Sequence, residues 1–138
     1  MKPVLLDTGC IVALLDRSER HHEKCAEAVQ GLNVPLVTCE PVIAEACYLL
    51  RNLRGAAEAV LKNVANGIFQ IPFQLDQEAA TVQRVFRKYR DRKIDLADAC
   101  LIALAERLET GTVLTLDGDF AIYRWAKNKP FELLVGIE

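Results

Sequence analysis

The sequence predicts an α/β fold, a three-layer α/β/α sandwich with a small, mostly parallel sheet. Short apolar runs alternate with longer segments of helical spacing along the whole chain, which is typical of helices that cover a parallel sheet. The helical segments contain more residues than the apolar runs, so helical hairpins should flank a small sheet.

Five short apolar runs are the expected strands. The first, residues 4–6, closes in the turn Asp7-Thr8-Gly9 and reads as a buried strand. The others are residues 35–38, 68–72, 112–116 and 131–135.

Six segments keep the spacing of helices, and several carry end signals. Thr8 is a candidate N-cap for the first helix, and Pro41 suits the first turn of the third. Asp95 is a good N-cap for the last helix, and Gly67 and Gly111 follow helix ends. The expected helices span residues 10–15, 22–30, 41–53, 56–66, 75–89 and 95–108.

Length and composition predict one domain over residues 1–138. Hydrophobic residues make up 51% of the chain and charged residues 26%, the balance of a soluble globular protein. The longest nearly apolar run is too short to span a bilayer, and Asp7 interrupts any signal peptide at the start. The five cysteines form no Cys-x-x-Cys motif, so we expect reduced thiols and a cytoplasmic protein.

One segment of this mildly acidic chain is strongly basic. The net charge is −2, yet residues 84–93 hold six basic residues and one acid. Such a segment can bind the phosphates of a nucleic acid, although a solvated helix end gives the same pattern. The candidate contacts are Arg87, Lys88, Arg90, Arg92 and Lys93.

Four acidic residues are expected to meet at one edge of the sheet. Asp7 and Asp117 each follow an expected strand, and Glu45 and Asp98 lie near the starts of expected helices. Sites in open parallel sheets form outside the carboxyl ends of the strands and near helix N-termini. Each acid taken alone also fits a turn or a helix surface.

Asp98 is the most informative of the four acids. It lies in the run Leu96 to Ala105, whose other members are all apolar, so its carboxylate should be buried. Several buried acids are compensated either by Arg or Lys partners or by a shared divalent cation. Oxygen ligands without His or Cys favour Mg²⁺ or Mn²⁺ over zinc, and such a centre suits phosphodiester hydrolysis.

The chain resembles the PIN-domain family and, within it, the VapC-type toxin ribonucleases. The matching segments are VLLDTG at residues 4–9, TCEPVIAEACYLL at 38–50, IDLADACLIALAERL at 94–108 and VLTLDGDF at 113–120. They occur in order along almost the whole chain, and the last two together are the most specific.

The resemblance implies a PIN-like sandwich and an endoribonuclease that uses Mg²⁺ or Mn²⁺. It implies an RNA substrate, a small antitoxin partner and a homodimer. We expect the basic segment 84–93 to contact the RNA backbone. The resemblance also implies that Asp7, Glu45, Asp98 and Asp117 are the catalytic, metal-binding acids. Asp119 is a further candidate ligand, and Thr8 and Thr115 are the residues expected to support the ligands.

Other functions stay open on the sequence. A non-catalytic interaction module of the same fold would use the acids for charge balance or partner binding. A DNA-directed nuclease of the wider PIN and flap-nuclease group is the other alternative, although this chain is short for one.

Overall fold

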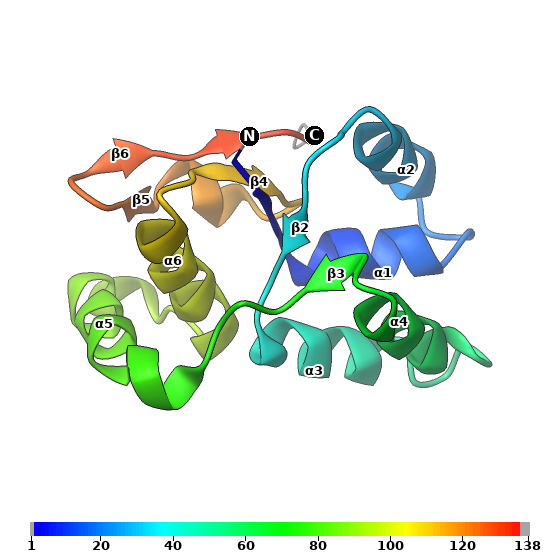
Figure 1. The fold of residues 1–138 in the computed structure, drawn as a ribbon, viewed down its shortest axis with the longest axis horizontal. Helices are drawn as coiled ribbons and strands as arrows, with labels where there is room; N and C mark the ends of the chain where they lie inside the picture. Colours follow the sequence, from blue (N-terminus) through cyan, green and yellow to red (C-terminus); the bar gives the residue numbers. More distant parts are fainter. Residues whose placement is uncertain (1, 136–138) are drawn as a thin grey trace.

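A five-stranded parallel sheet forms the centre of the molecule (Figure 1). The computed structural model describes residues 2–135. The strand order is β3-β2-β1-β4-β7, and every neighbouring pair is parallel. These strands are β1 (Val4–Leu6), β2 (Leu36–Val37), β3 (Phe69–Gln70), β4 (Thr112–Leu114) and β7 (Glu132–Leu133).

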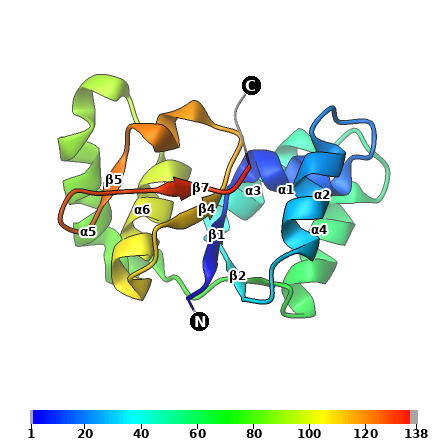
Figure 2. The same ribbon diagram turned by 90° about the horizontal axis from the view of Figure 1, so that it is seen from above.

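Six α-helices cover this sheet, as the sequence predicts. They are α1 (Thr8–Leu15), α2 (His22–Gln30), α3 (Glu40–Leu49), α4 (Ala56–Ala65), α5 (Leu75–Lys88) and α6 (Leu96–Leu108). Helices α5 and α6 lie on one side of the sheet and α1, α2 and α4 on the other, with α3 in contact with both α1 and α6 (Figures 1 and 2). The predicted α/β/α sandwich is therefore confirmed.

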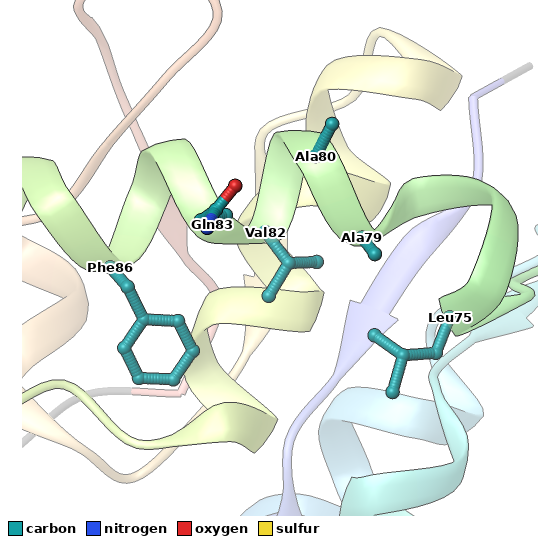
Figure 3. A pocket seen from close by; sticks show the side chains of 6 residues that line it. All are labelled: Leu75, Ala79, Ala80, Val82, Gln83 and Phe86. Carbon is teal, nitrogen blue, oxygen red and sulfur yellow. The ribbon is translucent and has the colours of Figure 1, made fainter.

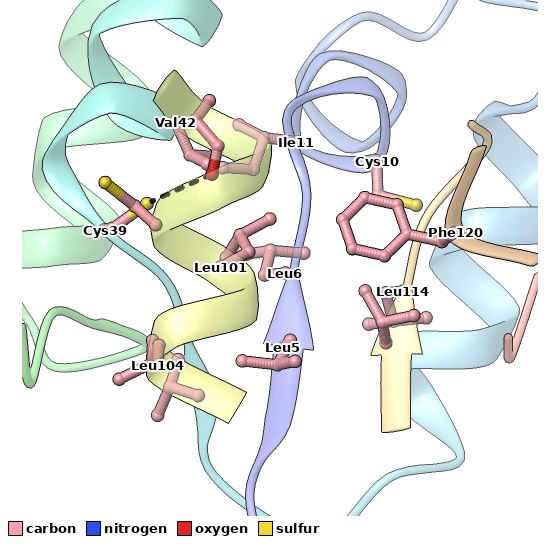
Figure 4. Packing of buried hydrophobic residues seen from close by; sticks show 14 of the residues in the cluster. Leu5, Leu6, Cys10, Ile11, Cys39, Val42, Leu101, Leu104, Leu114 and Phe120 are labelled. Atoms are coloured by element: carbon pink, nitrogen blue, oxygen red, sulfur yellow. Dashed lines mark hydrogen bonds between the residues drawn. The ribbon is translucent and has the colours of Figure 1, made fainter. Parts of the chain in front are cut away.

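The central strand is buried on both faces. Leu5 and Leu6 of β1 are fully buried, and Leu101 and Leu104 of α6 and Leu114 of β4 lie around them (Figure 4). A parallel strand covered by helices on both faces needs a continuous apolar sequence, which is what residues 4–6 provide. This packing fixes the carboxyl end of β1, where Asp7 follows.

Several predicted boundaries are wrong by a few residues. Thr8 is not the N-cap of α1, because Asp7 has the extended backbone of a cap and its own carboxylate accepts the Thr8 N–H. The predicted helix 41–53 begins at Glu40 and ends at Leu49, and turns carry the chain to Gly55. Strand β1 matches its predicted run, whereas the other four strands of this sheet are shorter than the runs that predict them.

A two-stranded antiparallel sheet was not predicted. Its strands are β5 (Arg124–Trp125) and β6 (Lys129–Pro130), joined by a turn in which Ala126 and Asn128 have positive φ. The chain carries no Gly in this turn, so the usual hairpin signal is missing. Two short 3-10 helices, η1 (Arg90–Arg92) and η2 (Gly118–Ala121), were also not predicted.

The structure also bears on membrane-spanning helices and on the cysteines. Within residues 2–135, no helix combines the length and apolar character needed to cross a membrane. All five cysteines are free thiols, and four of them are buried in the core.

Candidate metal centre

Asp7 is held at the end of β1 by two hydrogen bonds. Its Oδ1 accepts from the backbone N–H of Thr8 at 2.8 Å, and its Oδ2 accepts from the hydroxyl of Thr115 at 2.7 Å. The side chain is buried, with 5% of its surface exposed. Asp7 thus caps α1 and at the same time contacts the segment that follows the neighbouring strand β4.

Asp117 is placed beside Asp7 by the same threonine. Thr115 follows β4, and its Oγ1 accepts the backbone N–H of Asp117 at 2.9 Å while it donates to Asp7. The carboxylate of Asp117 in turn accepts the N–H of Asp119 at 2.9 Å and caps η2. The Thr115 hydroxyl therefore fixes the relative position of two acids from adjacent strand ends.

Asp98 reaches the same place from the first turn of α6. Asp95 caps this helix as predicted, since its Oδ1 accepts the Asp98 N–H at 2.9 Å. The residues from Ala97 to Ala105 are all buried, and Asp98 is 8% exposed. Its Oδ2 accepts a hydrogen bond from the hydroxyl of Tyr123 at 3.4 Å.

Three of the four predicted acids converge at one point. Asp7, Asp98 and Asp117 each offer a carboxylate oxygen, and these atoms all lie within 4.8 Å of one another. They line a cleft of about 270 Å³. The other residues that line this cleft are Thr8, Gly9, Glu45, Leu49, Asp95 and Leu116.

Glu45 stands at the rim of the cleft. It is exposed near the middle of α3, and its Oε1 accepts a hydrogen bond from the hydroxyl of Thr8 at 2.8 Å. Its carboxylate lies outside the group formed by the other three acids. Thr8 therefore links the two acids: its hydroxyl donates to Glu45, and its backbone N–H donates to the carboxylate of Asp7.

The surroundings of the buried acids oppose their ionisation. Burial raises the pKa of Asp98 to about 8, and the negative charges of Asp7, Asp95 and Asp117 add to the rise. Burial also raises the pKa of Asp7 to about 6, against the opposing hydrogen bonds from Thr115 and Thr8. Like charges at this separation are costly, so the ionised cluster requires a positive charge.

The donor set fits a hard divalent cation. It consists of carboxylate oxygens, two of them buried, from three different segments of the chain. The charges that shift the pKa of Asp98 are all negative, and the ion pairs Arg92–Asp119 and Arg107–Glu78 lie outside the cluster. Oxygen ligands of this kind suit Mg²⁺ and Mn²⁺, and a cation between them would compensate the buried charge.

The structure separates Asp119 from the three converging acids. Its side chain is half exposed and lies 3.5 Å from the guanidinium of Arg92. Arg92 belongs to η1, so this contact brings the predicted basic segment next to the turn that carries Asp117. The five predicted phosphate contacts, Arg87, Lys88, Arg90, Arg92 and Lys93, are all exposed.

Sequence reasoning missed Tyr123 as a neighbour of the centre. Its ring is buried against Tyr89 and Phe120 in edge-to-face contacts, and its hydroxyl points at Asp98. The residue lies three positions after the fourth matching segment, residues 113–120, and a single tyrosine in this stretch gives no signal beyond core packing.

A larger hollow lies away from the acids. It has a volume of about 530 Å³ and lies on α5, where the side chains of Leu75, Val82 and Phe86 border it (Figure 3). Its lining contains no titratable side chain, so it offers no carboxylate, imidazole or thiolate to a metal ion.

The fold and the centre together define a compact α/β protein with a carboxylate cluster at the carboxyl edge of its parallel sheet. The sequence model of the PIN domain matches residues 4–126. The chain belongs to the PIN-domain family.

The chain is similar to two proteins from Mycobacterium tuberculosis, one in sequence and one in structure. It is 34% identical over 116 residues to Ribonuclease VapC26 of strain ATCC 25618 / H37Rv, and the match covers 83% of this chain and 86% of that protein. The crystal structure of VapC20, described as a toxin that cleaves the sarcin-ricin loop, matches with a TM-score of 0.79 at 19% identity. That match covers 92% of this chain and 99% of VapC20, and it shows that the fold is shared.

Proposed function

We propose that the chain is a metal-dependent endoribonuclease that hydrolyses RNA phosphodiester bonds, as the toxin of a VapBC-type toxin–antitoxin pair. The observation that carries this proposal is the convergence of Asp7, Asp98 and Asp117 within 4.8 Å at the carboxyl edge of the sheet. The identity of 34% to a ribonuclease over most of both chains supports the reaction.

The cation in this proposal is Mg²⁺ or Mn²⁺. Asp7, Asp98 and Asp117 would hold it, and Glu45 would reach it directly or through a water molecule. We infer that Asp117 rather than Asp119 belongs to this set, because Asp119 pairs with Arg92 and lies outside the group. When bound, the cation activates water and stabilises negative charge on the attacked phosphate.

The chain's own residues supply the remaining parts of the reaction. Thr8 holds Oε1 of Glu45, which leaves Oε2 as the atom that takes the proton of the attacking water. Thr115 keeps Asp7 and Asp117 in fixed positions, so the centre needs little rearrangement before reaction. The exposed cations of the segment 87–93 would contact the RNA backbone.

The proposal includes an antitoxin and a second copy of the chain as protein partners. A small antitoxin would silence the toxin by occupying the acidic cleft, and the toxin would act as a homodimer. We also place the protein in the cytoplasm, where the five free cysteines would stay reduced. Light scattering on the purified chain measures the oligomeric state, and co-expression with a neighbouring small reading frame tests for the antitoxin.

The reaction is tested with the purified protein and structured or single-stranded RNA. We expect cleavage with Mg²⁺ or Mn²⁺, no cleavage in EDTA, and recovery when the metal is restored. Asp98→Asn should reduce cleavage at least a hundredfold because it removes a metal-binding charge. Circular dichroism should show the native fold in this variant.

A matched control makes the same chemical change elsewhere. Asp76→Asn removes an exposed carboxylate from the first turn of α5, and its cleavage rate should equal that of the wild type. RNA cleavage by Asp98→Asn at the wild-type rate would contradict the proposed role of the cluster. Preferential cutting of DNA of the same sequence would favour the DNA-directed alternative, and no cleavage of either would favour the interaction module.

A further inference from the structure

Tyr48 is an exposed aromatic side chain close to the acidic cleft. It is 61% exposed and lies on α3, three residues after Glu45, so the two side chains are neighbours on one helix face. The next residue, Leu49, is 53% exposed and lines the cleft itself. A ring in this position contributes little to the core and is available to a ligand that enters the cleft.

Arg51 is fixed over the ring of Tyr48. Its Nη1 donates a hydrogen bond to the carbonyl of Tyr48 at 2.8 Å, and its Cζ lies 3.8 Å from the ring centroid. The two contacts stack a planar cation on the aromatic ring. An exposed stack of this kind offers a flat surface and a positive charge at the same place.

A groove with further arginines in its lining includes Leu53 and Arg54, two and three residues after Arg51 in the sequence. It has a volume of about 470 Å³ and is lined by residues of the loop after α1 and of the turn after α3, among them Arg17 and Arg54. Leu53, also in its lining, follows Leu49 of the cleft by four residues. The second half of α3 therefore borders the acidic cleft, and the segment that follows this same end of the helix borders the arginine-lined groove.

We propose that Tyr48 and Arg51 form a stacking platform for a base of single-stranded RNA, with Arg54 and Arg17 holding the adjoining phosphates. Exposed aromatic rings and guanidinium planes are the groups on which unpaired bases stack. This inference rests on the proposed ribonuclease function and deepens it. It places substrate contacts along α3, whereas the basic segment 84–93 covers the last turns of α5 and η1.

The charges at this surface favour RNA over a protein as its occupant. Arg51 lies over the ring, and the groove lining holds Arg17 and Arg54 against one acid, Asp16, so the surface is positive in a chain whose net charge is −2. An apolar protein surface would leave these guanidinium groups without partners, whereas a strand whose phosphates flank each base pairs with them.

The platform is tested by RNA binding without cleavage. Fluorescence anisotropy with a fluorescein-labelled pool of random single-stranded 12-mers, in EDTA, gives the Kd of each full-length variant. We expect Tyr48→Ala to weaken binding about tenfold and Tyr48→Phe to bind within about twofold of the wild type, because the ring carries the stacking. Ile68→Ala, which truncates another exposed apolar side chain, should bind as the wild type does.

The salt dependence separates the base contact from the phosphate contacts. Arg54→Gln should lower the slope of log Kd against log salt by about 0.7, the change expected for one phosphate contact to a single strand. Tyr48→Ala should leave that slope unchanged. A 12-mer that carries 2-aminopurine should also lose its fluorescence quenching with Tyr48→Ala and keep it with Tyr48→Phe.

Several outcomes would overturn the platform. Equal Kd values for Tyr48→Ala and the wild type, or no RNA binding by the wild type, would each do so. A change of oligomeric mass in Tyr48→Ala with unchanged RNA affinity would assign the surface to a protein contact instead. The metal-dependent cleavage assay is independent of these binding measurements. If the wild type cleaves RNA but the binding test fails, only the stacking platform is contradicted, and the proposed ribonuclease function is not.

Discussion

The hydroxyl of Thr115 joins Asp7 to the segment after β4, donating to the Asp7 carboxylate at 2.7 Å from a fully buried position. The same oxygen accepts the N–H of Asp117. Two acids on neighbouring strand ends thus share one small side chain as their support. This arrangement explains why a threonine, rather than an apolar residue of the same shape, precedes the last acid of the sequence pattern.

Replacement of Thr115 by valine should weaken metal binding while the fold is kept. Valine has the same shape but cannot donate to Asp7 or accept from Asp117, so both acids lose their orientation. We expect the Kd for Mn²⁺, measured by electron paramagnetic resonance, to rise at least about tenfold. Thr115→Ser keeps the hydroxyl and should bind as the wild type does, and an unchanged Kd in the valine variant would contradict the supporting role.

Tyr123→Phe is expected to have a smaller effect of the same kind. The hydroxyl of Tyr123 lies 3.4 Å from Oδ2 of Asp98, which is a long hydrogen bond, and the ring packs against Tyr89 and Phe120. Phenylalanine keeps this packing, so the melting temperature should stay within about 2 °C. The Kd for Mn²⁺ should rise by about threefold, and a rise as large as that of Thr115→Val would show that Tyr123 is a principal support of the centre.

The sequence predicts the parts of the centre that depend on strand and helix ends. Asp7, Asp98 and Asp117 follow or begin regular elements whose apolar patterns are clear, and the topology of a parallel sheet brings such ends together. The distinction between Asp117 and Asp119 is not predictable in this way, because both occupy one turn. In the structure, Asp119 contacts Arg92 and lies outside the group of converging carboxylates.

The sequence also does not predict the exposure of Tyr48 or the contact of Tyr123 with Asp98. Each depends on packing between segments far apart or on exposure, which a periodic pattern does not encode. Tyr48 has the spacing of a helix residue but is 61% exposed, and Tyr123 reaches Asp98 only because the η2 turn packs its ring into the core. Strand ends were missed for a similar reason, since burial of an apolar run does not show where its hydrogen-bonded pairing stops.

Gly111 should be intolerant of alanine because of a close approach and not because of its backbone angles. A Cβ at Gly111 would lie 2.0 Å from Nε1 of Trp125, whose indole donates to the carbonyl of Pro130 at 3.2 Å. Gly111→Ala should therefore displace the tryptophan and destabilise the protein by about 2 kcal/mol, measured by urea unfolding. Gly31→Ala is the matched control, because a Cβ there meets only ordinary contacts at 3.6 Å, and its stability should be unchanged or slightly raised.

The stability of the metal-free protein should fall as the pH rises. The pKa of Asp7 is raised to about 6 and that of Asp98 to about 8, both above the value of about 3.9 for an unfolded aspartate. Between these values the folded state binds more protons than the unfolded state, so raising the pH favours unfolding. In EDTA, the melting temperature should therefore be several degrees lower at about pH 8 than at about pH 5.

Asp98→Asn should remove most of this dependence in the range where Asp98 titrates. An asparagine stays neutral, so the metal-free variant should melt at a higher temperature than the metal-free wild type at about pH 8, and the difference should shrink as the pH falls and vanish below about pH 4, the pKa of an unfolded aspartate. Added Mg²⁺ should raise the melting temperature of the wild type most at about pH 8, where the carboxylates are ionised, and should raise that of the variant much less. Differential scanning calorimetry of both proteins across this pH range, with and without Mg²⁺, measures these melting temperatures. Identical pH profiles for the two metal-free proteins would show that Asp98 is not the buried acid that destabilises the folded state.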